Sequence, residues 1–269
     1  MAVPRNLSRR MLSAAALAST LALLGGWSAA QAAVVTVRVT AQNVAPADGI
    51  AFAPLHVGFG NGSFDAFDDG SAAGAAIVSV AEGGSGSAWQ PAFASAEPQA
   101  VRGTIGAGGP ILAGVTRTLD FTIDTAINPF FTFASMVIPS NDHFIGNDNP
   151  QAYRIFDAMG NLLLNQISQL ASQIWDAGSE TTDPLAAAFV GNNDLRTAQN
   201  GVVSFNFSEL NAYNGLSTGA GYVFNNNLQA GTEIFRIGFE VLAVPEPSGL
   251  ALAALAICLL AGTRHRRQV

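Results

Sequence analysis

Residues 118–138, which read TLDFTIDTAINPFFTFASMVI, decide the fold of this chain. In the first part, apolar Leu119, Phe121 and Ile123 alternate with polar residues. Successive side chains of a strand point to opposite faces, so this pattern predicts a half-buried strand over residues 118–125. The second part, residues 130–138, is apolar almost throughout, which is typical of a central strand covered on both faces. The stretch therefore predicts a sheet with a buried central strand.

The chain on either side of this stretch continues the same pattern. Further strands are predicted over residues 34–40, 202–207 and 233–244, with Gly, Asn, Asp and Pro turns between the apolar runs. No regular alternation of strands and helices is present, so we predict an all-β fold, an antiparallel β-sandwich. The expected core residues are Val35, Val37, Leu119, Phe121, Phe131, Phe133, Phe235, Ile237 and Phe239.

Two stretches allow a helix. Residues 72–80 are compatible with a short one. In residues 162–174, apolar residues recur at near-helical spacing, which predicts a second short helix. They are Leu163, Ile167, Leu170 and Ile174. The arm of a hairpin turning at residues 158–161 is the alternative there. Residues 83–87, GGSGS, are expected to form an exposed loop that tolerates a chain break.

The charge of the chain excludes one class of partner. Of 269 residues only 12% are charged, against a usual share of roughly 25%. Lys is absent, and residues 34–243 hold 18 acidic residues against 6 Arg, a net charge near −12. Nucleic-acid binding requires a basic face, so we expect none. A single Cys, Cys258, excludes a disulfide framework and a Cys-based zinc site.

The N-terminal segment has the organisation of a secretory signal peptide. Basic Arg5, Arg9 and Arg10 precede an apolar run over residues 11–24, and the small-x-small pattern Ala30-Gln31-Ala32 follows. We therefore predict a signal peptide over residues 1–32. The alternative is a membrane helix that is retained.

The C-terminal segment has three parts in a fixed order. A Pro-Glu-Pro element is followed by fifteen apolar or small residues, 248–262, and then by a basic cluster. As a helix, this run would rise about 22 Å, short of the ~30 Å hydrocarbon core, a mismatch that bilayer thinning and snorkelling Arg can absorb. Trailing positive charge favours the cytoplasmic side for the tail. The residues concerned are Pro245, Glu246, Pro247, Arg264, Arg266 and Arg267.

This tail, residues 244–269, resembles the PEP-CTERM sorting signal of Gram-negative bacteria. The resemblance implies a transmembrane helix that holds the protein transiently in the inner membrane, and an exosortase-type enzyme that cleaves near Pro-Glu-Pro. It also implies a setting of exopolysaccharide, extracellular matrix and biofilm. An ordinary C-terminal membrane anchor is the alternative.

Familiar catalytic motifs are missing from the sequence. No G-x-S-x-G motif occurs, and a Walker A motif is impossible without Lys. His143 follows Asp142 and is a conceivable general base, but a lone histidine in a loop is more typical of a surface residue. Nothing in the sequence selects a pair of carboxylates for glycoside hydrolysis. We therefore predict no catalytic residues and no organic cofactor.

Two acidic loops are candidates for a metal site. The first covers residues 140–148 and directly follows the apolar strand; the second covers residues 175–180. Calcium takes six to eight oxygen ligands from carboxylates, carbonyls and water. The alternative is that both loops are ordinary Asx-turns at strand ends. A third cluster, Asp65, Asp68 and Asp69, is expected to be a solvated turn.

The segments FTFASMVIPSND (131–142) and WDAGSE (175–180) resemble the two signature motifs of the spondin N-terminal domain. The resemblance implies a C2-like antiparallel β-sandwich with a calcium ion at one loop end. Carried over residue by residue, it assigns the metal ligands to Asp142, Asp176 and Glu180. Ser179 stands where the family has Thr, and the cysteines of the animal domain are absent.

Together these features predict a spondin-like domain over residues 33–243, exported through the inner membrane to the cell surface or the extracellular space. We expect a non-enzymatic, calcium-binding adhesion or matrix module, whose partners are the exosortase-type enzyme and an extracellular polysaccharide or matrix protein. Two rival hypotheses are a secreted polysaccharide hydrolase that uses loop carboxylates, and a calcium-dependent binder of membrane surfaces. The net charge near −12 counts against the latter unless calcium bridges to lipid.

Overall fold

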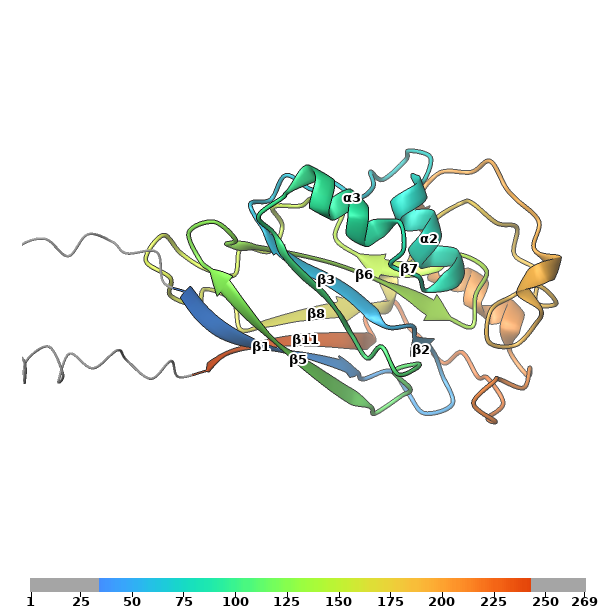
Figure 1. Cartoon of the computed structure of the whole chain (residues 1–269). Helices are drawn as coiled ribbons and strands as arrows, with labels where there is room; N and C mark the ends of the chain where they lie inside the picture. The colour runs from blue at the N-terminus through green and yellow to red at the C-terminus, as the bar shows by residue number, and fades with distance from the viewer. Residues whose placement is uncertain (1–33, 243–269) are drawn as a thin grey trace, which may run out of the picture.

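The computed structural model describes residues 34–242. The predicted signal peptide and sorting signal lie outside the described residues. The described chain consists mostly of two antiparallel β-sheets with few helices, so the predicted all-β sandwich is confirmed at this level. Figure 1 shows the two sheets packed face to face. Among the described residues, no helix is long and apolar enough to cross a membrane.

The first sheet has four strands, and β1 (Val34–Asn43) and β11 (Glu233–Leu242) lie at its centre. They run antiparallel, so that Thr36 pairs with Leu242. Side chains of β1 alternate between buried and half-buried, as the period-two sequence predicts. The edge strands are β5 (Thr116–Asp124) beside β1 and β8 (Gln166–Leu170) beside β11.

The second sheet is built around β6 (Phe130–Ile138), which is buried on both faces as its continuous apolar sequence predicts. Phe131, Phe133 and Val137 face the first sheet, while Ala134 and Met136 belong to clusters on the other side. The strands run in the order β10 (Ser204–Phe205), β9 (Trp175–Asp176), β7 (His143–Gly146), β6, β3 (Leu55–Gly60) and β4 (Val101–Ile105), and β2 (Ala51–Phe52) also pairs with β6.

Two helices cover the outer face of the second sheet, as Figure 1 shows. They are α2 (Ala75–Gly83), which confirms a helix near the predicted residues 72–80, and α3 (Trp89–Ala96). The close approach of α3 requires a glycine beneath it, because a Cβ on Gly58 would lie 2.0 Å from a ring carbon of Phe93. Three 3₁₀ segments complete the fold: η1 (Ala171–Gln173), η2 (Asn193–Leu195) and η3 (Phe207–Tyr213).

The helix predicted over residues 162–174 is wrong. Its central part is the edge strand β8, where Ile167 pairs with Ile237 of β11 and is buried in the sandwich core. The near-helical spacing assigned Leu163 to the buried face of this predicted helix, but the Leu163 side chain is 56% exposed. Pairing with β11 and burial of one face therefore outweigh the local periodicity.

Three smaller predictions also need correction. The strand predicted over residues 202–207 is only the two-residue β10. Leu119, expected in the core, is 38% exposed, because it lies on the edge strand β5, in which only Phe121 and Ile123 are buried. The 83–87 loop is only partly exposed, and the Gly84 carbonyl accepts a hydrogen bond from His56 Nε2 at 3.0 Å, while its tolerance of a chain break stays a prediction.

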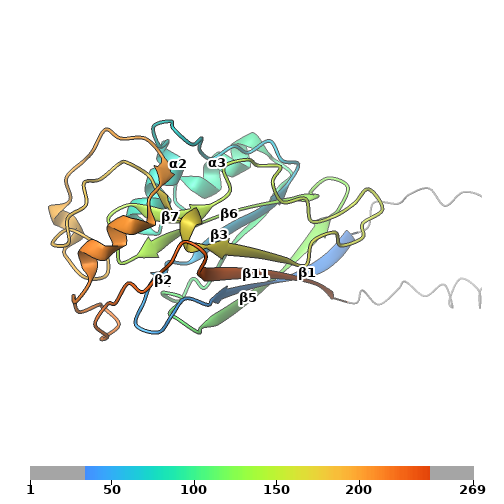
Figure 2. The ribbon, with the colours of Figure 1, turned by 180° about the vertical axis from the view of Figure 1, so that it is seen from behind.

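The two ends of the described chain, Val34 and Leu242, lie together at one end of the sandwich (Figure 1). Figure 2, seen from behind, shows β7 and the orange segment that contains η3 towards the opposite end. The acidic loops singled out in the sequence lie at this second end.

Candidate metal site

The turn after β6 places the first acidic loop. Ser140 Oγ donates a hydrogen bond to the Val137 carbonyl and accepts one from the backbone N–H of His143 at 3.1 Å. This turn starts β7 at His143, which pairs in register with Asp176 of β9. The strand pairing therefore brings the two predicted loops side by side, although 33 positions separate these residues in the sequence.

Asp142 ties the two loops together. Its Oδ2 accepts hydrogen bonds from the backbone N–H groups of Ser179 at 2.7 Å and Glu180 at 2.9 Å. Burial raises the pKa of the Asp142 carboxyl, and the charge of Asp176 adds to this, while the two N–H groups lower it. Asp142 and Asp176 thus lie close enough for their charges to interact.

Asp176 is held by its own turn. Its Oδ1 accepts a hydrogen bond from the backbone N–H of Gly178 at 2.7 Å, and its Oδ2 accepts one from Asn206 Nδ2 at 3.3 Å. Gly178 has φ +63°, and a Cβ there would lie 2.6 Å from the backbone nitrogen of Val202. The glycine noted in the sequence is thus required by both conformation and space.

The carboxylate of Glu180, the third predicted ligand, faces the positively charged side chain of Arg196. Its Oε1 lies 2.9 Å from Nε of Arg196, whose Nη1 lies 2.9 Å from Oε2 of Glu82. Burial raises the pKa of the Glu180 carboxyl to about 7, and the neighbouring Glu82 adds to the rise, while Arg196 opposes it. The structure therefore gives Glu180 a partner that does not involve a metal.

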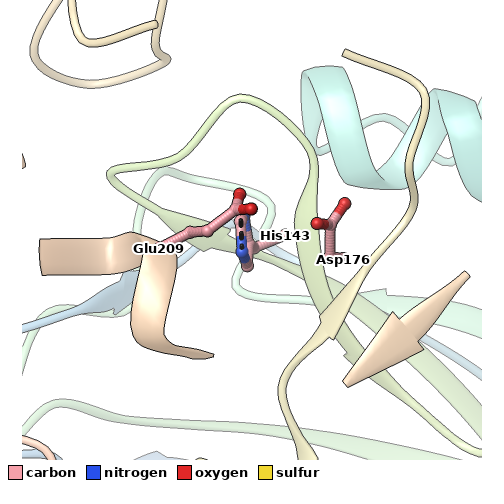
Figure 3. A group of neighbouring side chains, drawn as sticks. All are labelled: His143, Asp176 and Glu209. Carbon is pink, nitrogen blue, oxygen red and sulfur yellow. Dashed lines mark ion pairs between the residues drawn. The ribbon is translucent and has the colours of Figure 1, made fainter. Parts of the chain in front are cut away.

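A different group of side chains comes together next to Asp142. His143, Asp176 and Glu209 each offer one ligand atom, and these atoms all lie within 4.8 Å of one another. Figure 3 shows the three side chains, with Glu209 and Asp176 on either side of His143. Glu209 comes from η3, and its Oε2 accepts a hydrogen bond from the Thr182 hydroxyl.

The sequence did not identify two members of this group. His143 was expected to be a surface residue, and this is wrong, because its side chain is only 1% exposed. The strand β7 carries it into the interior, where Nε2 lies 2.8 Å from the Asn206 carbonyl oxygen. Glu209 has no sequence signal at all, since neither its spacing nor its neighbours connect it with the two motifs.

The donor set only partly fits the ion that the spondin resemblance implies. Two carboxylates, with a third from Asp142 nearby, suit a divalent cation, but a buried imidazole does not belong to the all-oxygen shell of calcium. The Asp65 cluster is exposed, in agreement with the predicted solvated turn. The predicted trio Asp142, Asp176 and Glu180 remains a prediction as a calcium ligand set.

Comparison with known proteins adds no family. No protein-family model matches the chain, and no curated protein matches it. The resemblances to the spondin domain and to the PEP-CTERM signal therefore remain predictions from the sequence.

Proposed function

We propose that this chain is an exported, non-enzymatic module of the cell surface or extracellular matrix, whose β-sandwich is stabilised by a divalent cation. The observation that carries the proposal is the group of buried His143, buried Asp176 and half-buried Glu209, with Asp142 beside it. Closely spaced carboxylates repel one another, and a bound cation removes that repulsion. Calcium is the ion that the spondin resemblance implies.

The sequence supports the export part of the proposal. The segment 1–32 has the organisation of a signal peptide, and the segment 244–269 that of an exosortase substrate. Residues 34–243 have a net charge near −12 and contain no Lys. This charge disfavours nucleic-acid binding and suits a role outside the cell better. The missing catalytic motifs favour adhesion or matrix assembly, with an extracellular polysaccharide or matrix protein as the partner.

The cation part is tested on the purified full chain by thermal unfolding with and without a chelator. We expect chelation to lower the melting temperature and re-addition of divalent ion to restore it. Mass action gives a stabilisation of about 2.7 kcal/mol at a free ion concentration one hundred times Kd. A melting temperature that chelation leaves unchanged would contradict the proposal.

The export part is tested by intact-mass analysis of the protein recovered outside a Gram-negative host with an exosortase. We expect a mature chain that begins near residue 33 and ends near Pro245. Replacing Pro245, Glu246 and Pro247 by Ala should keep the uncleaved form in the membrane fraction. Recovery of the unprocessed chain from the cytoplasm would overturn this part, and release of matrix sugars by the purified protein would favour the hydrolase hypothesis instead.

A further inference from the structure

The imidazole of His143 lies between acceptor atoms on both sides. Its Nε2 is 2.8 Å from the carbonyl oxygen of Asn206 and 4.0 Å from Oε2 of Glu209. Its Nδ1 is 4.0 Å from Oδ1 of Asp142 and, among the described residues, has no hydrogen-bond partner. The His143 side chain is 1% exposed, so bulk water does not compensate for the missing partner.

Neither neutral tautomer suits these surroundings. With the proton on Nε2, the lone pair of Nδ1 faces the Asp142 carboxylate. With the proton on Nδ1, the lone pair of Nε2 faces the Asn206 carbonyl and the Glu209 carboxylate. A neutral imidazole has one donor and one acceptor nitrogen, so one side is always repulsive. A cation on one nitrogen removes the conflict.

We propose that this cation is a transition-metal ion such as Zn²⁺ or Mn²⁺, bound by Nε2 of His143 and by the carboxylates of Asp176 and Glu209. The inference rests on the proposed function and deepens it by naming the class of ion. In this arrangement Nδ1 carries the proton and points at Asp142. Ligating histidines commonly direct their second N–H at a carboxylate in this way, which fixes the ring and its tautomer.

The distances agree with an ion in this position. Zinc lies about 2.0–2.2 Å from nitrogen and carboxylate ligands, so two ligand atoms of one ion are separated by at most about 4.4 Å. The 4.0 Å between Nε2 and Glu209 Oε2 lies within this reach and is too long for a hydrogen bond. The three ligand atoms all lie within 4.8 Å of one another. An ion on Nε2 would replace the 2.8 Å contact between Nε2 and the Asn206 carbonyl, so this carbonyl must move for the three ligands to close on one ion.

The ligand chemistry favours this class over calcium. Imidazole nitrogen suits zinc, iron, nickel and copper, and the two carboxylates also suit manganese, whereas calcium takes oxygen ligands only. Calcium would also need six to eight oxygen ligands, and Glu180, the carboxylate expected to contribute, is paired with Arg196. A proton is the competing cation, since a doubly protonated His143 would also satisfy both nitrogens.

The experiment is a titration of the metal-stripped full chain with Zn²⁺, Mn²⁺, Ca²⁺ and Mg²⁺ separately, followed by calorimetry and by thermal unfolding. We expect Zn²⁺ or Mn²⁺ to bind at one site and to raise the melting temperature. His143→Gln and Glu209→Gln should each weaken this binding at least about tenfold. Glu240→Gln is the matched control, because Glu240 is an exposed carboxylate on β11 and its removal should leave the affinity unchanged.

Nitrogen-15 NMR of the histidine rings keeps the proposal testable if the His143 variant fails to fold. In the wild-type chain, Zn²⁺ should shift Nε2 of His143 and leave Nδ1 protonated. Two protonated nitrogens that Zn²⁺ does not change would overturn the inference in favour of the imidazolium.

The outcomes also separate this inference from the proposed function. Binding of Ca²⁺ alone, with an affinity that His143→Gln does not change, would overturn the transition-metal inference and leave the cation-stabilised module intact. If none of the four ions binds or shifts the melting temperature, both fall together.

Discussion

Arg196 neutralises charge where the sequence had predicted a metal ligand. Its guanidinium contacts Glu180 on one side and Glu82 on the other, both at 2.9 Å. The Glu180 side chain is 3% exposed, so without this cation its charge would lie in a poorly solvated site beside a second carboxylate. The arginine therefore supplies a positive charge to Glu180 from within the chain.

We expect Arg196→Gln to destabilise the protein at pH 8 by about 1–3 kcal/mol, the cost of leaving a buried ionised group without its partner. The effect should be smaller at pH 5. The pKa of Glu180 is raised to about 7 in the folded chain, above the ordinary value of 4.5. Stability linked to this group is therefore present at low pH and is lost as the pH rises through about 7. Without Arg196 the pKa rises further and the loss deepens.

Urea unfolding of both proteins at the two pH values measures this difference. Arg38→Gln is the control, because it breaks an exposed ion pair with Asp120 and should show little effect at either pH. An Arg196 variant that loses the same stability at pH 5 and pH 8 would show that the arginine acts through packing and not through charge.

The predictability of the site differs from residue to residue. Asp142 and Asp176 could be selected because each lies in a short motif at a strand end. His143 was visible in the sequence but was assigned to the surface, because a strand of four residues gives too short a pattern to reveal its burial. Glu209 and Arg196 come from the segment 177–232, which is mostly irregular, and only tertiary contacts bring them to the site.

At the level of secondary structure, period-two alternation predicted β1 and β5 with ends correct within three residues, and the apolar run predicted β6 with the same bounds. The strand predicted over residues 233–244 begins where β11 begins, and residues 243–244 lie outside the described residues. The prediction failed at β8, whose apolar residues have helical spacing. It also missed α3, whose position depends on the glycines beneath it rather than on a strong pattern of its own.

The end of α2 provides a test at the scale of an element. Gly84 closes this helix with φ +60°, and its N–H donates to the Val80 carbonyl at 2.8 Å. A Cβ at this position would lie 2.6 Å from Cβ of Ala53. We expect Gly84→Ala to cost about 2–4 kcal/mol, which combines the left-handed conformation of a non-glycine residue with overpacking.

Gly70→Ala separates these two contributions. Gly70 also has a positive φ, +78°, but a Cβ there would meet no atom within 4 Å. This variant should therefore lose only about 1–2 kcal/mol, the conformational part. Equal losses for the two variants in chemical denaturation would show that the contact with Ala53 adjusts at no cost.

In the whole molecule, β6 connects the parts of the core. One hydrophobic cluster fills the space between the sheets, and a second lies between the second sheet and the two helices. Because β6 contributes side chains to both, neither layer can separate without exposing the other. The candidate metal site lies beside this strand, since β7 pairs with β6 directly.

The position of the two chain ends determines how the molecule carries a mechanical load. If the protein is tethered beyond residue 242 and pulled from the end that holds η2, force runs along β11, and its hydrogen bonds to β1 and β8 are loaded together in shear. Pulling residues 34 and 242 apart instead loads the β1–β11 hydrogen bonds in peeling geometry, so that they break one residue pair at a time. Single-molecule stretching between residues 194 and 242 should therefore require a higher rupture force than stretching between residues 34 and 242. Equal forces would mean that β11 is not the strand that bears the load. A molecule held beyond residue 242 and engaged at the far end would thus resist force best along the direction of β11.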